Sequence, residues 1–287
     1  MNDAATGASP DPAPAEAVAI DALPFVAPCR IVATSAPVDW IRRGWRDFRA
    51  APRQSLTYGA VVVLLSLAMA YVTIRFGGDW ELLALVSGFI LVAPLVAVGT
   101  YSISEQLERG VRPSLRRCFL DERRAFGNLM VFALMLMVVF LVWWRAASAV
   151  HVFFPVDMTT PEWTDYLQFL AIGGAVGSLF ALIVFAVAAF SLPMLVDRDV
   201  DSITAAVTSV NAVLRNKKPM AVWAAMIVVA VTPGFALLLL GRERGAHFAV
   251  AMLLLGFTLP LVGHATWHGY RATIDAAAWP RSAHLDP

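Results

Sequence analysis

Six long apolar stretches divide this sequence and leave little of it free for a soluble fold. Hydrophobic residues make up 59% of the 287 residues and charged residues only 15%, against the roughly 25% that is usual in soluble domains. The first stretch has 19 residues without a charge. As a helix it would be about 28 Å long, close to the ~30 Å hydrocarbon core of a bilayer. The sequence therefore predicts an all-α polytopic membrane protein with six transmembrane helices, at Leu56–Ile74, Leu82–Ile103, Leu129–Trp144, within Tyr166–Val196, at Met220–Leu240 and at Ala246–Thr266.

The basic residues crowd into every second gap between these stretches. Of the 22 Lys and Arg residues, 18 lie before the first stretch, in the second and fourth gaps, or after the sixth stretch. Because Lys and Arg are retained on the cytoplasmic side of membrane proteins, this bias predicts a bacterial inner-membrane protein with both termini in the cytoplasm. The basic residues form no stripe of the kind that binds nucleic acid, so no nucleic-acid partner is expected.

The cytoplasmic gaps also carry apolar side chains at the three- and four-residue spacing of amphipathic helices. These side chains are Trp40, Ile41, Trp45 and Phe48, then Leu115, Phe119, Leu120 and Phe126, then Ile203, Val207, Val210 and Leu214. Such helices lie in the lipid headgroup region, so the sequence predicts three hairpins with cytoplasmic interfacial helices. The side chains expected to contact anionic headgroups are Arg42, Arg43, Arg46, Arg116, Arg117, Arg123, Arg124, Lys217 and Lys218.

The ends of the chain differ in composition from the apolar part. Residues 1–36 are rich in Ala and Pro, which favours a disordered cytoplasmic tail without a signal peptide. Residues 37–275 form the predicted membrane domain, and 276–287 a short cytoplasmic tail. Cys29 and Cys118 lie far apart in the sequence and are expected to be reduced thiols.

Four short strings carry a resemblance to a known family. They are GWRDF (44–48), LERG (107–110), SLPMLVDRDVD (191–201) and GHATWHGYR (263–271). With these strings, over about residues 38 to 275, the chain resembles the prokaryotic integral membrane family Domain of Unknown Function 2189. The resemblance implies a six-span membrane fold and no established activity. Some members of the family are labelled as cytochrome c oxidase subunits.

The sharpest candidate for chemistry is a pair of histidines near the end of the sixth stretch. His264 and His268 are four residues apart, hence on one face of a helix, where two imidazoles can hold one metal ion. A carboxylate or another donor would have to complete the site. Asp197 and Glu105 lie at the right depth, and Tyr101 and Tyr270 lie near it. The alternative is that the histidines hydrogen-bond between helix ends. Haem fits poorly, because bis-His ligation needs rings from opposite faces of the iron.

A wider polar cluster is predicted at the same membrane depth. Its members are His264, His268, Asp197, Arg198, Arg271, Glu105 and Tyr101. Ionisable groups near a membrane are functional candidates because they are costly to bury unless paired. The competing interpretation is that the acidic residues after Pro193 cap the next helix, with Asp201 and Ser202 at its start. Gly173, Gly174, Gly177 and Ser178 give a small-residue face suited to bundle packing or to a homodimer.

No motif for phosphoryl transfer, serine hydrolysis, zinc proteolysis or dinucleotide binding occurs in the chain. The sequence therefore favours a non-enzymatic membrane scaffold, accessory subunit or lipid-interacting protein, without a cofactor and with membrane lipid as its partner. A small-solute or ion transporter or channel, lined by the Pro-containing stretches, is the alternative. A metal- or haem-associated redox protein using His264 and His268 is the second alternative.

Overall fold

The computed structural model describes residues 24–76, 96–153, 163–240 and 245–281. This part of the chain is helical and contains no strand, apart from two isolated bridges that join Cys29 to Ile274 and Arg198 to Arg281. Five long helices carry five of the predicted membrane stretches. They are α2 (Pro52–Phe76), α4 (Leu115–Phe153), α5 (Trp163–Ala188), α8 (Lys217–Leu240) and α9 (Gly245–Thr273). Of the predicted second stretch, residues 82–95 lie outside the described part and the rest belongs to a helical segment, 96–108.

Three segments of the described chain are long and apolar enough to cross a membrane, by length and composition. They are Ala125–Val150, Ala171–Asp197 and His247–Thr273. In the most apolar 18-residue window of the first segment only 17% is buried by the rest of the protein, against 44% in each of the others. Of these three windows, the one in α4 is therefore the least covered by protein.

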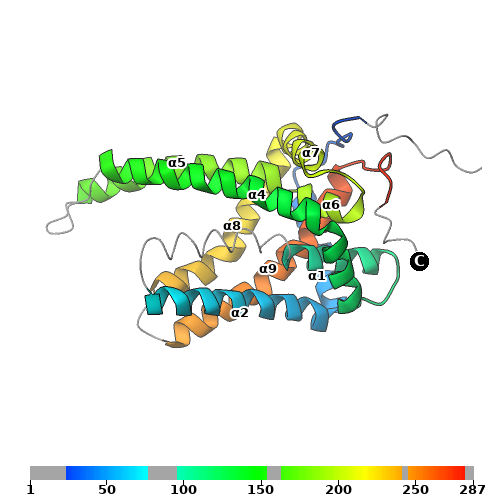
Figure 1. Cartoon of the computed structure of the whole chain (residues 1–287), viewed down its shortest axis with the longest axis horizontal. Helices are drawn as coiled ribbons and strands as arrows, with labels where there is room; N and C mark the ends of the chain where they lie inside the picture. Colours follow the sequence, from blue (N-terminus) through cyan, green and yellow to red (C-terminus); the bar gives the residue numbers. More distant parts are fainter. Residues whose placement is uncertain (1–23, 77–95, 154–162, 241–244, 282–287) are drawn as a thin grey trace, which may run out of the picture.

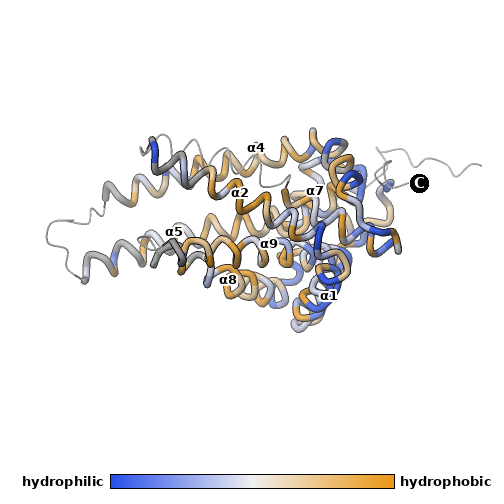
Figure 2. Tube along the Cα trace, turned by 90° about the horizontal axis from the view of Figure 1, so that it is seen from below, coloured by the Kyte–Doolittle hydropathy of each residue, from blue (hydrophilic) through white to orange (hydrophobic). Residues whose placement is uncertain are grey.

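The long helices form two groups that meet at one end of the molecule (Figure 1). In one group α4 and α5 lie side by side, and in the other α9 packs against α2 and α8. Helix α1 (Ala36–Ala50), the short helix α6 (Ser191–Asp197) and α7 (Ser202–Arg215) gather at the shared end. Figure 2 shows that hydrophilic residues concentrate at this end, whereas the long helices are mainly hydrophobic. The molecule is thus polar at the end where the predicted candidate site lies.

Helix α1 packs its apolar face against protein. Trp40 and Phe48 are buried, and Gly44 meets α9 so closely that a Cβ there would lie 2.6 Å from the backbone nitrogen of Ala265. The amphipathic pattern of this segment predicts a helix in the lipid headgroups. The period is correct, but Trp40 and Phe48 contact the protein core. The exposed residues of α1 are its arginines, Trp45, Val38, Asp39 and Ala50.

Helix α7 has the opposite arrangement. Its buried face consists of small and hydroxyl side chains, Ser202, Thr204, Ala205, Ala206, Thr208, Ser209 and Ala212. Ile203 and Leu214 are more than half exposed, so the apolar face of α7 points away from the protein. The basic segment before the third stretch forms no separate helix, because α4 begins at Leu115 and continues unbroken through the apolar stretch.

A side chain from α7 interrupts the helix that precedes it. The hydroxyl of Ser209 donates to the carbonyl of Ala186 (2.8 Å) and accepts from the backbone N–H of Phe190 (3.0 Å), two groups that would otherwise bond each other. Pro193 lacks an N–H and removes a further helical bond of this type. The break between α5 and α6 is thus satisfied by protein groups, as buried backbone requires.

Both chain ends of the described part belong to the fold. The N–H of Arg30 donates to the carbonyl of Thr273, and Asn216 binds the backbone of Val32 and Arg30. Trp279 is buried. The predicted tails therefore overlap the folded part: residues 24–35 and 276–281 pack on the helices, and residues 1–23 lie outside the description.

Candidate functional site

The last three turns of α9 contact all of the other strings that carry the family resemblance. Segment 263–271 faces Gly44 and Asp47 of α1, Glu108 of the segment 96–108, and Asp197 of α6. Residues separated by up to 221 positions in the sequence are thereby brought together. The strings are therefore the contact surfaces of one helix junction.

His264 lies at the centre of this junction with no exposed surface. Its Nε2 is 2.9 Å from the hydroxyl of Ser55 on α2, and its Nδ1 is 2.8 Å from the hydroxyl of Ser104. The ring of Phe48 packs edge-on against the imidazole. Because both ring nitrogens have hydrogen-bond partners, His264 joins α2, α9 and the segment 96–108.

His268 makes a separate interaction one turn further along α9. Its Nε2 lies 2.7 Å from Oδ2 of Asp47 on α1, and both side chains are only 14% exposed. The two predicted metal-binding histidines thus point to different partners. In the described residues no group of three or more His, Cys, Asp or Glu side chains is arranged to hold a metal ion. The geometry instead gives both rings the role of hydrogen-bonding between helices.

Asp197 accepts hydrogen bonds from three other residues of the junction. Its Oδ2 accepts from the hydroxyl of Tyr270 (2.7 Å), from Nε of Arg198 (3.0 Å) and from Arg271 (3.4 Å). Arg198 also donates to the carbonyl of Trp279. The carboxylate is 6% exposed, so these donors replace the water that it loses on burial. Asp197 thereby fixes the end of α6 to α9 and to the C-terminal segment.

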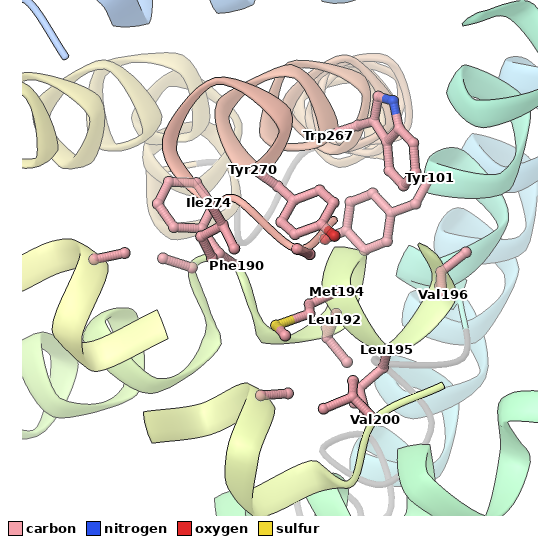
Figure 3. Close-up of a cluster of buried hydrophobic side chains, with 14 of the residues drawn as sticks. Tyr101, Phe190, Leu192, Met194, Leu195, Val196, Val200, Trp267, Tyr270 and Ile274 are labelled. Carbon is pink, nitrogen blue, oxygen red and sulfur yellow. The ribbon is translucent and has the colours of Figure 1, made fainter. Parts of the chain in front are cut away.

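Glu108 extends the same network to the segment 96–108. One of its carboxylate oxygens accepts from Arg271 (2.9 Å) and the other from Nε1 of Trp267 (3.0 Å). Figure 3 shows Trp267, Tyr270 and Tyr101 together above the α6 side chains Leu192 and Met194. Glu105, another predicted member, pairs with Arg109 on its own helix.

The structure therefore places Asp197, Arg198 and Arg271 in one network, places His264 and His268 at the same junction with separate partners, and adds partners that sequence reasoning missed. The missed groups are Trp267, Glu108, Asp47, Ser55 and Ser104. Asp47 and Glu108 lie inside the GWRDF and LERG strings, so the resemblance was the signal that could have identified them.

The predicted helix cap after Pro193 is confirmed. Asp201 accepts from the backbone N–H groups of Ile203 and Thr204, both at 2.9 Å, at the start of α7. Partial burial raises the pKa of this carboxyl, but the hydrogen bonds from Thr204 and Ile203 outweigh it and leave the pKa below its usual value. Asp201 therefore acts locally and takes no part in the junction.

The residues predicted to contact lipid lie outside the junction. The side chains of Arg42, Arg43 and Arg46 are exposed on α1, as are Arg116 and Arg123 on α4 and Lys217 and Lys218 at the start of α8, and Arg117 is partly exposed. The side chain of Arg124 is outside the description. A Cβ added at Gly173, Gly174 or Gly177 would meet no atom within 4 Å, so no other described helix packs on this face of α5.

The comparisons with known proteins agree with a membrane location. A family described as "Predicted integral membrane protein (DUF2189)" matches residues 82–197, which is less than half of the chain. This confirms the resemblance over that range, which includes LERG and Ser191–Asp197. GWRDF and GHATWHGYR lie outside it. No curated protein and no solved structure matches the chain.

Proposed function

We propose that this integral membrane protein is a non-enzymatic scaffold that binds anionic lipid at its polar end. One contrast carries the proposal. The polar side chains of the junction bond to one another, whereas most of the predicted lipid-contacting cations are exposed beside apolar side chains. A catalytic site needs groups that can reach a substrate, and a lipid-binding surface needs cations next to apolar contacts.

Six membrane spans with both termini in the cytoplasm fit this role. The α2 and α8 helices have 25 and 24 residues, which is about 36 Å at 1.5 Å per residue and enough to cross a bilayer. With the three segments that qualify by composition and the segment that includes 96–108, they make the proposed set of six. The polar end then faces the cytoplasm of the bacterial inner membrane.

Retention of lipid tests the proposal directly. The full chain, extracted in a mild detergent, is expected to keep phosphatidylglycerol in preference to phosphatidylcholine. Neutralising Arg116, Arg117, Arg123 and Arg124 to Gln should abolish the preference, because each basic residue at a membrane surface contributes about 1 kcal/mol. Equal retention of both lipids by the wild-type protein would contradict the proposed function.

A second candidate, passage of a small solute, is favoured by one observation. A hollow of about 380 Å³ lies beside Pro260, between α2, α9 and the segment 96–108, with Tyr58, Thr100 and Thr266 among its mainly apolar walls. Flux of a solute into proteoliposomes that is lost in Pro260→Ala, while the variant unfolds at the same temperature as the wild type, would support it. A protein that binds anionic lipid and carries no flux supports the scaffold instead.

A further inference from the structure

The first turns of α4 and the chain before them enclose a hollow of about 370 Å³ with an unusual lining. Three guanidinium groups, of Arg112, Arg116 and Arg117, line it together with the hydroxyl-bearing Ser114. The first turn of α4 contains no acidic residue. In the part of the chain that the structure describes, no ion pair involves any of these three arginines.

The same hollow has apolar walls. Val111 and Leu120 line it and are 40% and 39% exposed. Leu115 and Phe119 on the same turns of α4 are exposed as well. Exposed apolar side chains beside cations are accommodated where lipid headgroups meet acyl chains.

Gln106 holds the hollow in shape. Its side chain is fully buried, its Oε1 accepts from the backbone N–H of Ser114 (2.9 Å), and its Nε2 donates to Ser102 (3.2 Å) and to Sγ of Cys118 (3.4 Å). These bonds tie the chain before α4 to the segment 96–108 and to the first turn of α4. The arginines are therefore carried on a fixed backbone, so little ordering of the backbone is needed for binding.

We infer that this hollow binds the phosphate group of an anionic membrane phospholipid, with Arg112, Arg116 and Arg117 on the phosphate oxygens and Val111 and Leu120 against the start of the acyl chains. Guanidinium groups match phosphate because their forked donors bind two oxygens at once. The apolar walls select a lipid over a free phosphate ion. This inference rests on the proposed function. It places one lipid-binding site among the several exposed basic regions of the protein.

Two exposed arginines outside the predicted lipid-contacting set supply a matched control. Arg53 lies on α2 and Arg215 at the end of α7, and both are exposed. Replacing these two removes the same charge from the same end of the molecule. If lipid bound only through a general attraction to the basic end, both double substitutions would weaken binding equally. A specific site is weakened only by substitution of its own arginines.

The experiment is a titration of the detergent-purified full chain, followed by the rise of its thermal midpoint. The probes are dihexanoyl phosphatidic acid, dihexanoyl phosphatidylcholine and sodium phosphate. For phosphatidic acid, Arg116→Gln with Arg117→Gln is expected to raise the half-saturating concentration about 30-fold, since each arginine near an anionic surface contributes roughly a factor of five. Arg53→Gln with Arg215→Gln should change it by less than about threefold.

The double substitution Arg116→Lys with Arg117→Lys keeps the charge but removes the forked donors. It therefore tests the same site if the Gln variant does not fold. Binding about fivefold weaker than wild type is expected for this pair, because Lys offers phosphate a point charge only. Unchanged binding in both the Gln and the Lys pairs, or an equal loss in the pair with Arg53→Gln and Arg215→Gln, overturns the site. Sodium phosphate that binds as well as phosphatidic acid overturns the assignment to lipid. If the wild type binds no anionic lipid at all, the proposed function itself fails.

Discussion

The carbonyl oxygen of Gly256 on α9 lies against Gly59 of α2, at a position only 2.0 Å from where a Cβ of residue 59 would be. Four residues after Gly256 comes Pro260, which has no N–H to donate to that carbonyl. The missing side chain at residue 59 lets α2 approach and cover the carbonyl. Gly59 thus lets α2 and α9 cross closely at the turn where Pro260 removes a helical hydrogen bond.

Gly59→Ala is expected to destabilise the protein by roughly 1–3 kcal/mol, because the added methyl meets backbone that cannot move aside easily. Gly127→Ala is the control, since nothing lies within 4 Å of that position and Ala favours a helix. Thermal unfolding in detergent, followed by circular dichroism, measures both changes. A Gly59→Ala protein as stable as wild type would show that α2 and α9 are not packed at this crossing.

His264→Ala should cost about 2–4 kcal/mol of unfolding free energy. The change opens a cavity and removes the imidazole partner of the buried Ser104 and Ser55 hydroxyls, of which Ser55 keeps its bond to the carbonyl of Ala51. His268→Ala should cost less, about 1–2 kcal/mol, because its bond to Asp47 lies nearer the surface. Metal analysis of the wild-type protein and both variants accompanies the unfolding curves. Bound metal lost from both variants would restore the metal-binding interpretation.

Asp197→Ala is expected to be the most damaging change to the junction, by about 3–5 kcal/mol. It removes the acceptor shared by Tyr270, Arg198 and Arg271 and leaves the nearly buried guanidinium of Arg198 without its carboxylate. The control is Asp275→Ala, which removes an Arg–Asp pair whose side chains are 55% and 41% exposed and should change stability little. Denaturant titration of the two variants compares them, and similar midpoints would argue against the buried network.

Asp201→Ala should lower stability by about 1 kcal/mol near pH 7, whereas Asp201→Asn keeps the helix cap and should be almost neutral. The pKa of Asp201 is below its ordinary value of 3.8 in the folded protein. Its contribution is therefore fully present above that value and is lost as the pH falls through the lower folded pKa. Unfolding midpoints between pH 6 and pH 2 should show wild type approaching Asp201→Ala at the acid end. A constant gap would contradict the assignment.

The positions of the helices were readable from the sequence because long apolar runs and the charges between them fix where a helix can enter a bilayer. The direction of each amphipathic face was not. Trp40 and Ile203 follow the same spacing, yet Trp40 is buried against protein and Ile203 is exposed. The spacing of apolar residues follows from the local geometry of a helix. What covers the apolar face of that helix depends on residues far away in the chain.

The candidate site was predicted in part for the same reason. Asp197, Arg198 and Arg271 were placed together because all three lie at one membrane depth. Depth alone could not pair His268 with Asp47 or Trp267 with Glu108, since a helix can be rotated about its axis without changing the depth of its residues. The rotation is set by close contacts such as that between Gly44 and Ala265.

The junction on α9 has a consequence for biosynthesis. Asp47 precedes its partner His268 by 221 residues, so at about 5–20 residues per second the ribosome needs roughly 10–45 s to supply the second residue after the first. During that interval α1 has neither Ala265 nor His268 to pack on, and Trp40 lacks part of the protein surface that buries it in the folded molecule. A nascent chain arrested before residue 263 should therefore remain open to proteolysis at α1 and become resistant only when the rest of α9 is made.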